Sequence, residues 1–387
     1  MLVGVPKERF QDERRVALVP ADVPALVKAG LQVAVEAGAG TEAGYPDAEY
    51  QAKGATIAAS RRELFGKADI LTCVRAGGAD PDGEAADLEL LRKGQYLIAF
   101  IEPLWAPASA ARLAERGVSA LAMELIPRIS RAQSMDALSS QATIAGYKAV
   151  LLAAETLPRI FPMLMTAAGT IAPARAFVIG VGVAGLQALS TAKRLGAITE
   201  AYDVRPAVKD QVESVGAKFV ELPLETSAAE DKGGYAKAQG EEFYKRQQEL
   251  MASVIARNDV VITTAAIPGK RSPVLVTAAM VKGMKPGAVI IDMAAERGGN
   301  CELTRPNEVV QTGGVTILGP TNLAGTAPGH ASQLYSRNVT NLLRHMVKEG
   351  ALKLDLEDEI VKDTLVTHGG AITNQRVRDL LKPVGAV

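Results

Sequence analysis

The segment Ala176-Phe-Val-Ile-Gly180-Val-Gly182-Val-Ala-Gly185 joins a short apolar run to a turn that contains three glycines. The run is typical of a buried parallel strand, and residues 186–195 continue as a helix. Gly180 allows a tight turn, Gly182 lets the backbone approach a pyrophosphate, and Gly185 lets the helix pack closely on the strand. The phosphates would face the helix N-terminus, where unpaired N–H groups favour negative charge. The segment therefore predicts a dinucleotide-binding Rossmann domain, in preference to an ordinary strand–helix turn.

An acidic side chain supports this prediction and bears on the choice of cofactor. Asp203 follows the predicted strand 198–202, about twenty residues beyond the glycines, where a carboxylate accepts hydrogen bonds from the adenosine ribose. Its charge also repels a 2′-phosphate, so we predict NAD(H) as the cofactor. Arg205 lies close enough to bind a 2′-phosphate, which would favour NADP(H), but Asp203 is given the greater weight. Further predicted cofactor contacts, at the carboxyl ends of strands, are Val183, Ala184, Val204, Thr264, Ala265, Ala266 and Asn322.

Strand and helix patterns alternate in two separate series. The predicted strands are 2–6, 32–36, 68–74, 96–101 and 119–125 in the first series, and 176–179, 198–202, 218–221, 259–264, 288–293 and 315–318 in the second. This alternation predicts an α/β protein with two Rossmann-like, doubly wound parallel-sheet domains. We place the first, discontinuous domain at residues 1–132 plus 330–387, a linker helix at 133–157, and the NAD(H)-binding domain at 158–329.

Composition argues against other classes of protein. Basic and acidic residues number 43 each, so no nucleic-acid partner is expected. With 2 cysteines and 3 histidines, no metal site is expected either. The sequence predicts neither a signal peptide nor a membrane-spanning helix.

Two segments of the second series do not fit a sheet or a helix. Residues 158–173 are uncharged apart from Arg159 and contain three prolines. They predict a hairpin or arm packed on a second copy of the chain, with burial inside the monomer as the alternative. Residues 226–240, which include Tyr235, are polar and rich in small side chains. They predict a mobile flap, with an ordinary exposed loop equally compatible.

A polar loop precedes the predicted linker helix. It reads Pro127-Arg-Ile-Ser-Arg-Ala-Gln-Ser-Met-Asp-Ala-Leu-Ser-Ser-Gln141 and is dense in hydrogen-bonding side chains. Ser130 and Gln133 have the spacing of a capping box, and Asp136 suits the first turn of a helix. From the residues alone, helix capping is favoured over a functional role.

This loop also carries a resemblance to a known family. Residues 122–141 closely resemble the NAD(H)-binding alpha-1 component (domain I) of the proton-translocating NAD(P)+ transhydrogenases. The likeness continues in residues 165–170, 180–188, 233–237 and 290–294 and covers essentially the whole chain. It implies that one group of residues holds the nicotinamide and its ribose: Arg128, Gln133, Asp136 and Ser139. It also implies that Asp203 binds the other ribose and that Tyr235 closes over the nucleotide.

The resemblance further implies a reaction and partners. The reaction is Si-specific hydride transfer between NADH and NADP(H) on a partner subunit, coupled to proton movement through a membrane-spanning subunit. Both partners would be separate chains, and this chain would be cytoplasmic and peripheral on the inner face of the cell membrane. A homodimer is also expected.

Alanine dehydrogenases, which are related, provide the main alternative. Oxidation of an amino acid needs a proton acceptor and a carboxylate-binding group. That family uses a lysine and a histidine at places where this chain has Arg75 and Glu102, although Arg15 is retained. Hydride passing between two nicotinamides requires positioning and no such base. A regulatory NAD-binding module without redox chemistry is a third possibility, which the polar set Arg128, Gln133 and Asp136 disfavours.

Overall fold

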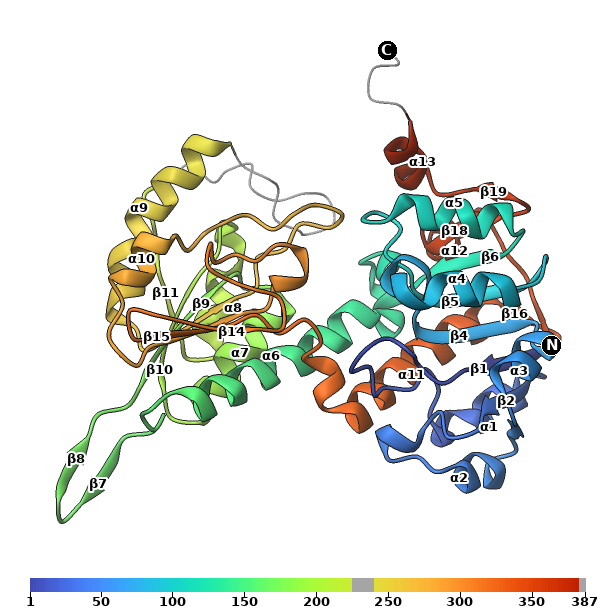
Figure 1. Cartoon of the computed structure of the whole chain (residues 1–387), viewed down its shortest axis with the longest axis horizontal. Coiled ribbons are helices and arrows are strands. Elements are labelled where there is room, and N and C mark those ends of the chain that lie inside the picture. The colour runs from blue at the N-terminus through green and yellow to red at the C-terminus, as the bar shows by residue number, and fades with distance from the viewer. Residues whose placement is uncertain (225–239, 383–387) are drawn as a thin grey trace. The chain divides into compact units, whose positions relative to one another are not determined.

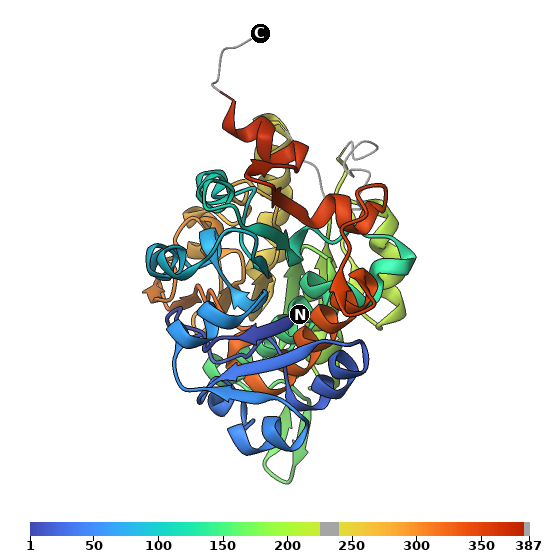
Figure 2. The same cartoon turned by 90° about the vertical axis from the view of Figure 1, so that its right-hand side faces the viewer.

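The computed structural model describes residues 1–224 and 240–382. The chain divides into two compact units, one made of Met1–Gln141 with Ala324–Val387 and the other of Ala142–Leu323. The first division falls inside helix α6 (Ala137–Thr156), beyond the predicted limit at residue 132, and the second precedes the predicted limit at residue 329. Figures 1 and 2 show that the N-terminal segment, in blue, and the C-terminal segment, in red, belong to the same unit. The first unit is therefore discontinuous.

The described part of the first unit contains an 8-stranded sheet in the order β19-β18-β6-β5-β4-β1-β2-β3. Strands β1 to β6 are parallel, and the C-terminal strands β18 and β19 add an antiparallel edge beside β6. The parallel strands follow the doubly wound order 3-2-1-4-5-6. Their bounds are β1 Leu2–Val5, β2 Gln32–Glu36, β3 Thr56–Ala58, β4 Ile70–Arg75, β5 Tyr96–Phe100, β6 Ser119–Ala122, β18 Leu365–His368 and β19 Ala371–Ile372.

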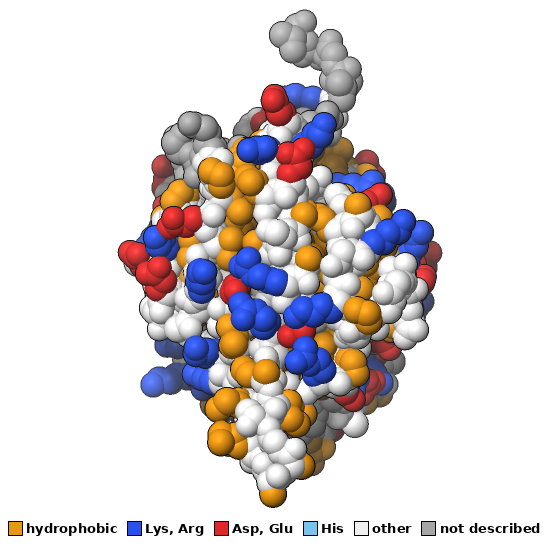
Figure 3. Space-filling view, turned by 90° about the vertical axis from the view of Figure 1, so that its left-hand side faces the viewer, with side chains coloured by type: hydrophobic (Ala, Val, Ile, Leu, Met, Phe, Trp, Pro, Cys, Tyr) orange, Lys and Arg blue, Asp and Glu red, His pale blue; other side chains and the backbone are white. Residues whose placement is uncertain are grey.

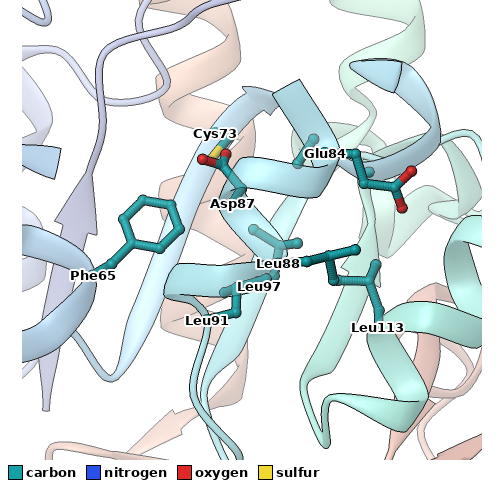
Figure 4. A pocket seen from close by; sticks show the side chains of 10 residues that line it. Phe65, Cys73, Glu84, Asp87, Leu88, Leu91, Leu97 and Leu113 are labelled. Atoms are coloured by element: carbon teal, nitrogen blue, oxygen red, sulfur yellow. The ribbon is translucent and has the colours of Figure 1, made fainter. Parts of the chain in front are cut away.

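Helices cover both faces of this sheet. On one face Ile70 and Ile98 pack with Tyr335 and Leu342 of the long amphipathic helix α11 (Pro328–Met346). On the other face Leu71 and Leu97 pack against helices α3, α4 and α5; neighbouring strand residues alternate between the faces. Figure 4 shows part of that second core, where leucines surround a cavity of about 10 Å³, room for one water. Remaining helices are α1 Val23–Lys28, α2 Asp47–Ala52, α3 Arg61–Lys67, α4 Pro81–Leu90, α5 Pro107–Glu115, α12 Glu359–Thr364 and α13 Gln375–Leu381.

The second unit repeats the same strand order. Its 7-stranded sheet runs β11-β10-β9-β12-β13-β15-β14 over the described residues, with β14 antiparallel to β15. Taken in chain order, the parallel strands again read 3-2-1-4-5-6, which confirms the predicted α/β class with Rossmann-like sheets. Their bounds are β9 Arg175–Ile179, β10 Ile198–Tyr202, β11 Lys218–Phe219, β12 Val260–Thr263, β13 Val289–Asp292, β14 Val309–Thr312 and β15 Val315–Leu318.

Two helix layers enclose the second sheet. The C-terminal part of α6 packs with α7 (Val183–Arg194) on one face, and α9 (Glu241–Arg257) with α10 (Ala278–Lys282) covers the other. Helix α8 (Lys209–Ser214) precedes β11. A Cβ on Gly146 would lie 2.2 Å from the carbonyl oxygen of Ala184. Helix α6 therefore passes closely over the start of α7.

The predicted arm at residues 158–173 contains a two-stranded hairpin. Strands β7 (Leu164–Thr166) and β8 (Gly169–Ile171) extend away from the second sheet in Figure 1. Met163 is 59% exposed and Met165 is 74% exposed, so these side chains are not buried within the monomer. Figure 3 looks onto this side of the molecule and shows hydrophobic side chains gathered toward its lower end, below a group of Lys and Arg. Among the described residues, no helix has the length and apolar character needed to cross a membrane.

Candidate functional site

The glycine turn follows β9, where the strand order reverses. Strand β10 pairs with one side of β9 and β12 with the other. Gly180 has φ +92°, and a Cβ on it would lie 2.8 Å from Thr264 Oγ1. A Cβ on Gly185 would lie 2.0 Å from the Gly180 carbonyl oxygen, so both positions need glycine for the chain to fold this way. By contrast, a Cβ on Gly182 would meet nothing within 4 Å. Gly182 thus borders open space in front of α7, where a pyrophosphate could approach the backbone.

Asp203 lies at the end of β10 and is 8% exposed. Its carboxylate accepts hydrogen bonds from the backbone N–H groups of Val181 (2.7 Å) and Arg205 (2.8 Å). The Arg205 guanidinium donates to both carboxylate oxygens, from Nε (2.9 Å) and Nη2 (2.8 Å). Arg205 Nη2 also donates to the Val181 carbonyl (3.2 Å). The arginine that the sequence presented as a competitor of Asp203 is therefore its ion-pair partner.

The end of β12 lies next to the glycine turn. Thr264 Oγ1 donates to the Gly180 carbonyl (2.8 Å), which joins the two strand ends. Ala265 is held by Asn300, whose Oδ1 accepts from Ala265 N (3.0 Å) and whose Nδ2 donates to Ala265 O (2.9 Å). Ala266, the next residue, is exposed. Among the other predicted contacts, Val183 and Ala184 lie at the start of α7. Val204 directly follows Asp203, and Asn322 lies beyond β15.

A buried polar network fixes this edge, and sequence reasoning missed it. Asn300 and Asp292 are fully buried, and Asn300 N donates to Asp292 Oδ2 (2.8 Å). The Asp292 carboxylate also accepts from Thr304 Oγ1 (2.7 Å) and Thr263 Oγ1 (2.9 Å). The available signal was the same one used for Asp203, an acidic residue at the carboxyl end of an apolar strand. Asn300 has no comparable local signal.

The polar loop at residues 127–141 belongs to the first unit, whereas the residues around the glycine turn belong to the second. Residues Ser130–Met135 form a 3-10 turn, and helix α6 begins only at Ala137. Asp136 caps that helix by accepting hydrogen bonds from Ser139 N (2.9 Å) and Ser139 Oγ (2.5 Å). The predicted capping box of Ser130 and Gln133 is wrong, because no side chain caps the 3-10 turn and α6 starts later. Asp136 alone has the capping role.

The remaining loop residues differ in exposure. Arg128 and Gln133 are exposed. Arg131 anchors the turn by an ion pair with Asp358 (2.7 Å), and Asn338 Nδ2 donates to the Ser134 carbonyl (3.0 Å). The loop thus presents two long polar side chains from a backbone that is fixed at both sides. Tyr235 and residues 226–239 of the predicted flap lie outside the described residues.

The corresponding edge of the first sheet carries a cluster of charges in place of a glycine turn. Glu13 pairs with Arg15 (2.5 Å) and Arg75 (3.3 Å), and all three side chains are at most 10% exposed. Glu8 accepts hydrogen bonds from Val74 N (2.7 Å) and Arg75 N (3.1 Å). Burial, reinforced by the charge of Glu13, raises the pKa of Glu8 to about 8. Burial opposes ionisation of Glu13 too, but the Arg15 guanidinium outweighs it and lowers the pKa of Glu13.

A second carboxyl pair follows β5 and β6. Glu102 has φ +51°, and its N–H and that of Ile101 donate to Glu124 Oε1. Burial and the neighbouring Glu102 raise the pKa of Glu124 to about 8. The carbonyl of Glu102 accepts from Trp105 N (3.0 Å) and Ala106 N (2.8 Å), so this residue shapes the turn after β5. Within the described ranges, no cluster of three or more His, Cys, Asp or Glu side chains is placed to hold a metal ion.

Comparison with known proteins places both units in one family. The family Alanine dehydrogenase/PNT, N-terminal domain, matches residues 4–145, and Alanine dehydrogenase/PNT, C-terminal domain, matches residues 149–375. The chain is 48% identical to an NAD(P) transhydrogenase subunit alpha chain of Rhodospirillum rubrum, over 97% of this chain and 98% of that protein. It is 28% identical to alanine dehydrogenase of Bacillus subtilis, over 98% and 95% of the two chains.

Solved structures give the same ranking. A transhydrogenase from Sinorhizobium meliloti is 42% identical, with a TM-score of 0.83 over 97% of this chain and 99% of that one. An L-alanine dehydrogenase has a TM-score of 0.81 at 24% identity, over 98% and 99% of the two chains, and shows the shared fold alone. The chain therefore belongs to the alanine dehydrogenase/PNT family and, within it, to the alpha subunits of NAD(P) transhydrogenase.

Proposed function

We propose that this chain is the NAD(H)-binding subunit of a proton-translocating transhydrogenase. It transfers hydride between NADH and NADP+ bound on a partner subunit, and a membrane-spanning partner couples this transfer to proton movement. The observation that carries the proposal is the open space beside Gly182, next to a buried acid, Asp203, at the end of the second strand. This arrangement fits a dinucleotide with its pyrophosphate at the start of α7 and its adenosine ribose beside Asp203.

The residues of this chain bind and orient. The reduced nicotinamide, when bound, supplies a hydride with both electrons of its C–H bond; NADP+ becomes NADPH and NAD+ remains here. The N–H groups at the start of α7 meet the phosphates, and Asp203 accepts hydrogen bonds from the ribose. The Asp292–Asn300 network holds Ala265 at the nicotinamide side of the crevice. Arg128 and Gln133 supply polar contacts at the site of transfer, where correct positioning is the main requirement.

The first unit disfavours the amino-acid dehydrogenase alternative. Such an enzyme needs a general base and a cation for the substrate carboxylate. Here Arg15 and Arg75 both bind Glu13, and the strand-end position after β5 holds Glu102. Both cationic groups are thus already paired with a carboxylate inside the unit.

The partners are part of the proposal. The R. rubrum and S. meliloti relatives support a transhydrogenase complex, in which the NADP(H)-binding and membrane-spanning subunits complete the reaction. Through them, the chain is peripheral on the cytoplasmic face of the membrane.

The proposed function is tested by reconstitution. NADH should be oxidised only when NADP+ and membranes carrying the partner subunits are both present. Reduction of NAD+ by alanine with the chain alone would support the dehydrogenase alternative. NADH binding without turnover in either assay would support a regulatory module.

The hairpin supports a homodimer. Its exposed side chains Met163, Leu164 and Met165 adjoin an open cavity of about 800 Å³ lined by Ile160 and Phe161 among others. Exposed apolar surface of this kind usually marks a protein contact. Sedimentation at micromolar concentration should show a dimer, and Met165→Glu should convert it to a monomer. The control Leu356→Glu, which changes an exposed apolar side chain outside the hairpin, should leave the dimer intact. A monomeric wild-type chain would contradict the proposal.

A further inference from the structure

The acceptor positions of Asp203 are filled by donors of this chain. A carboxylate offers about four lone-pair positions for hydrogen bonds. Among the described residues, four donors use them: the N–H groups of Val181 and Arg205, and Nε and Nη2 of Arg205. The two backbone donors are fixed by the turn and by the end of β10. The two guanidinium donors belong to a side chain, which can turn away.

The adenosine ribose needs the positions that the guanidinium occupies. Both ribose hydroxyls can reach a carboxylate at the end of β10 only as hydrogen-bond donors to it. A ribose that binds Asp203 therefore displaces the Arg205 side chain, while the bonds from Val181 N and Arg205 N remain. The displaced guanidinium is attached two residues from Asp203 and stays beside the 2′ position of the ribose.

We propose that Arg205 is a specificity-determining residue, held out of 2′-phosphate recognition by its bidentate pairing with Asp203. The guanidinium has the planar, two-donor geometry that matches a phosphate as well as a carboxylate. While Asp203 is ionised, it neutralises this cation and repels a 2′-phosphate. Without that charge, Arg205 becomes the group that binds NADP(H). The crevice thus contains a latent NADP(H) site that a single acid suppresses.

The inference rests on the proposed binding of NAD(H) to this crevice, and titration of the wild-type chain tests that first. The full-length chain is titrated with NADH and with NADPH, and binding is followed by the fluorescence of the reduced nicotinamide. Failure of NADH to bind the wild type would overturn the proposed function, whatever the variants do. The variants are Asp203→Asn, Arg205→Gln and the double variant, each checked for an unchanged melting temperature.

Asp203→Asn should bind NADPH at least tenfold more tightly than the wild type does. The double variant should lose this gain, because the phosphate-binding group is gone. The NADPH affinity of Asp203→Asn should also fall more steeply with salt than its NADH affinity, since an ion pair to the 2′-phosphate is screened. Arg205→Gln alone should bind NADH at least as tightly as the wild type, because no guanidinium competes with the ribose.

Two results would overturn the inference. The first is an NADPH gain in Asp203→Asn that the double variant keeps, or no gain at all in a folded Asp203→Asn. The second is weaker NADH binding by Arg205→Gln, which would mean that the arginine orients Asp203 for the ribose. Arg175→Gln is the matched control. Arg175 begins β9 and pairs with Glu200 (2.7 Å), at the end of that strand opposite to the glycine turn. This variant removes one positive charge and should change neither affinity.

Discussion

The two units arrange their parallel strands in the same order, yet they differ in the residues that follow the first strand, at the place where the strand order reverses. In the second unit, β9 leads into a glycine turn that leaves open space at Gly182. In the first, β1 leads into Pro6, Lys7 and Glu8, and the edge is filled by the paired charges of Glu13, Arg15 and Arg75. Strand order alone therefore creates a place for a crevice, and the residues after the first strand determine whether a phosphate can enter it.

The largest effect should come from the charge cluster of the first unit. Glu13→Gln leaves Arg15 and Arg75 without the carboxylate that compensates both, and breaking a buried ion pair in this way costs about 3–5 kcal/mol. We expect the free energy of unfolding of the first unit, measured by urea titration, to fall by that amount. NADH should still bind under native conditions. Glu63→Gln, which breaks an exposed Glu–Lys pair, should change little. Unaltered stability of Glu13→Gln would mean that the cluster is not structural.

The next effect should fall on nucleotide binding in the second unit. Gly182→Ala places a methyl group in open space, so folding should be unaffected, while the pyrophosphate loses its closest approach to the backbone. NADH affinity should fall at least about tenfold, or roughly 1.4 kcal/mol, in a calorimetric titration. Gly185→Ala serves as the contrast, because its methyl group meets the Gly180 carbonyl and should lower the melting temperature. Normal NADH binding by Gly182→Ala would place the phosphates elsewhere.

A third variant asks whether the first unit contributes to transfer although it lacks a phosphate turn. Gln133→Asn moves an exposed amide back by one methylene. A misplacement of about 1 Å between reacting groups can cost around a hundredfold in rate. We expect near-normal NADH affinity and hydride transfer at least about tenfold slower in single turnovers of the reconstituted complex. Ser134→Ala in the same turn is the control, and a wild-type rate in Gln133→Asn would remove Gln133 from the site.

The last expected effect is a pH dependence of the stability of the first unit. The pKa of Glu124 rises from 4.5 to about 8 on folding, so its contribution to stability is complete below pH 4.5 and is lost progressively as the pH rises to about 8. Glu124→Gln removes this loss. Its free energy of unfolding should exceed that of the wild type above pH 8, and the difference should shrink toward pH 4.5. A difference that does not vary with pH would contradict this explanation.

Sequence reasoning recovered the parts of the fold that have strong local signals. The predicted strand, glycine turn and helix at residues 176–195 correspond to β9 and α7, because the glycines and the apolar runs act within a few residues. The short strand β3 and the antiparallel edges β14, β18 and β19 were missed. Such strands have two to four residues, and their pairing depends on partners far along the chain.

The site shows the same division. The tight turn at Gly180 and Gly185 and the strand-end position of Asp203 could be predicted from spacing alone. Asn300 could not, because its role arises from hydrogen bonds to Ala265, which is distant in sequence. The pairing of Arg205 with Asp203 was equally invisible, since sequence shows that two charges are neighbours and not which way the side chains turn.

The discontinuity of the first unit also sets an order of events during synthesis. Its sheet ends at β6 until β18 is made, and the face that includes Ile70 and Ile98 is uncovered until α11 supplies Tyr335 and Leu342. The ribosome releases every residue of the second unit before those segments emerge. A nascent chain therefore holds a complete nucleotide-binding unit beside an unfinished one with an open sheet edge and bare apolar surface. Chaperones should accordingly engage the beginning of this protein until its last sixty or so residues have emerged.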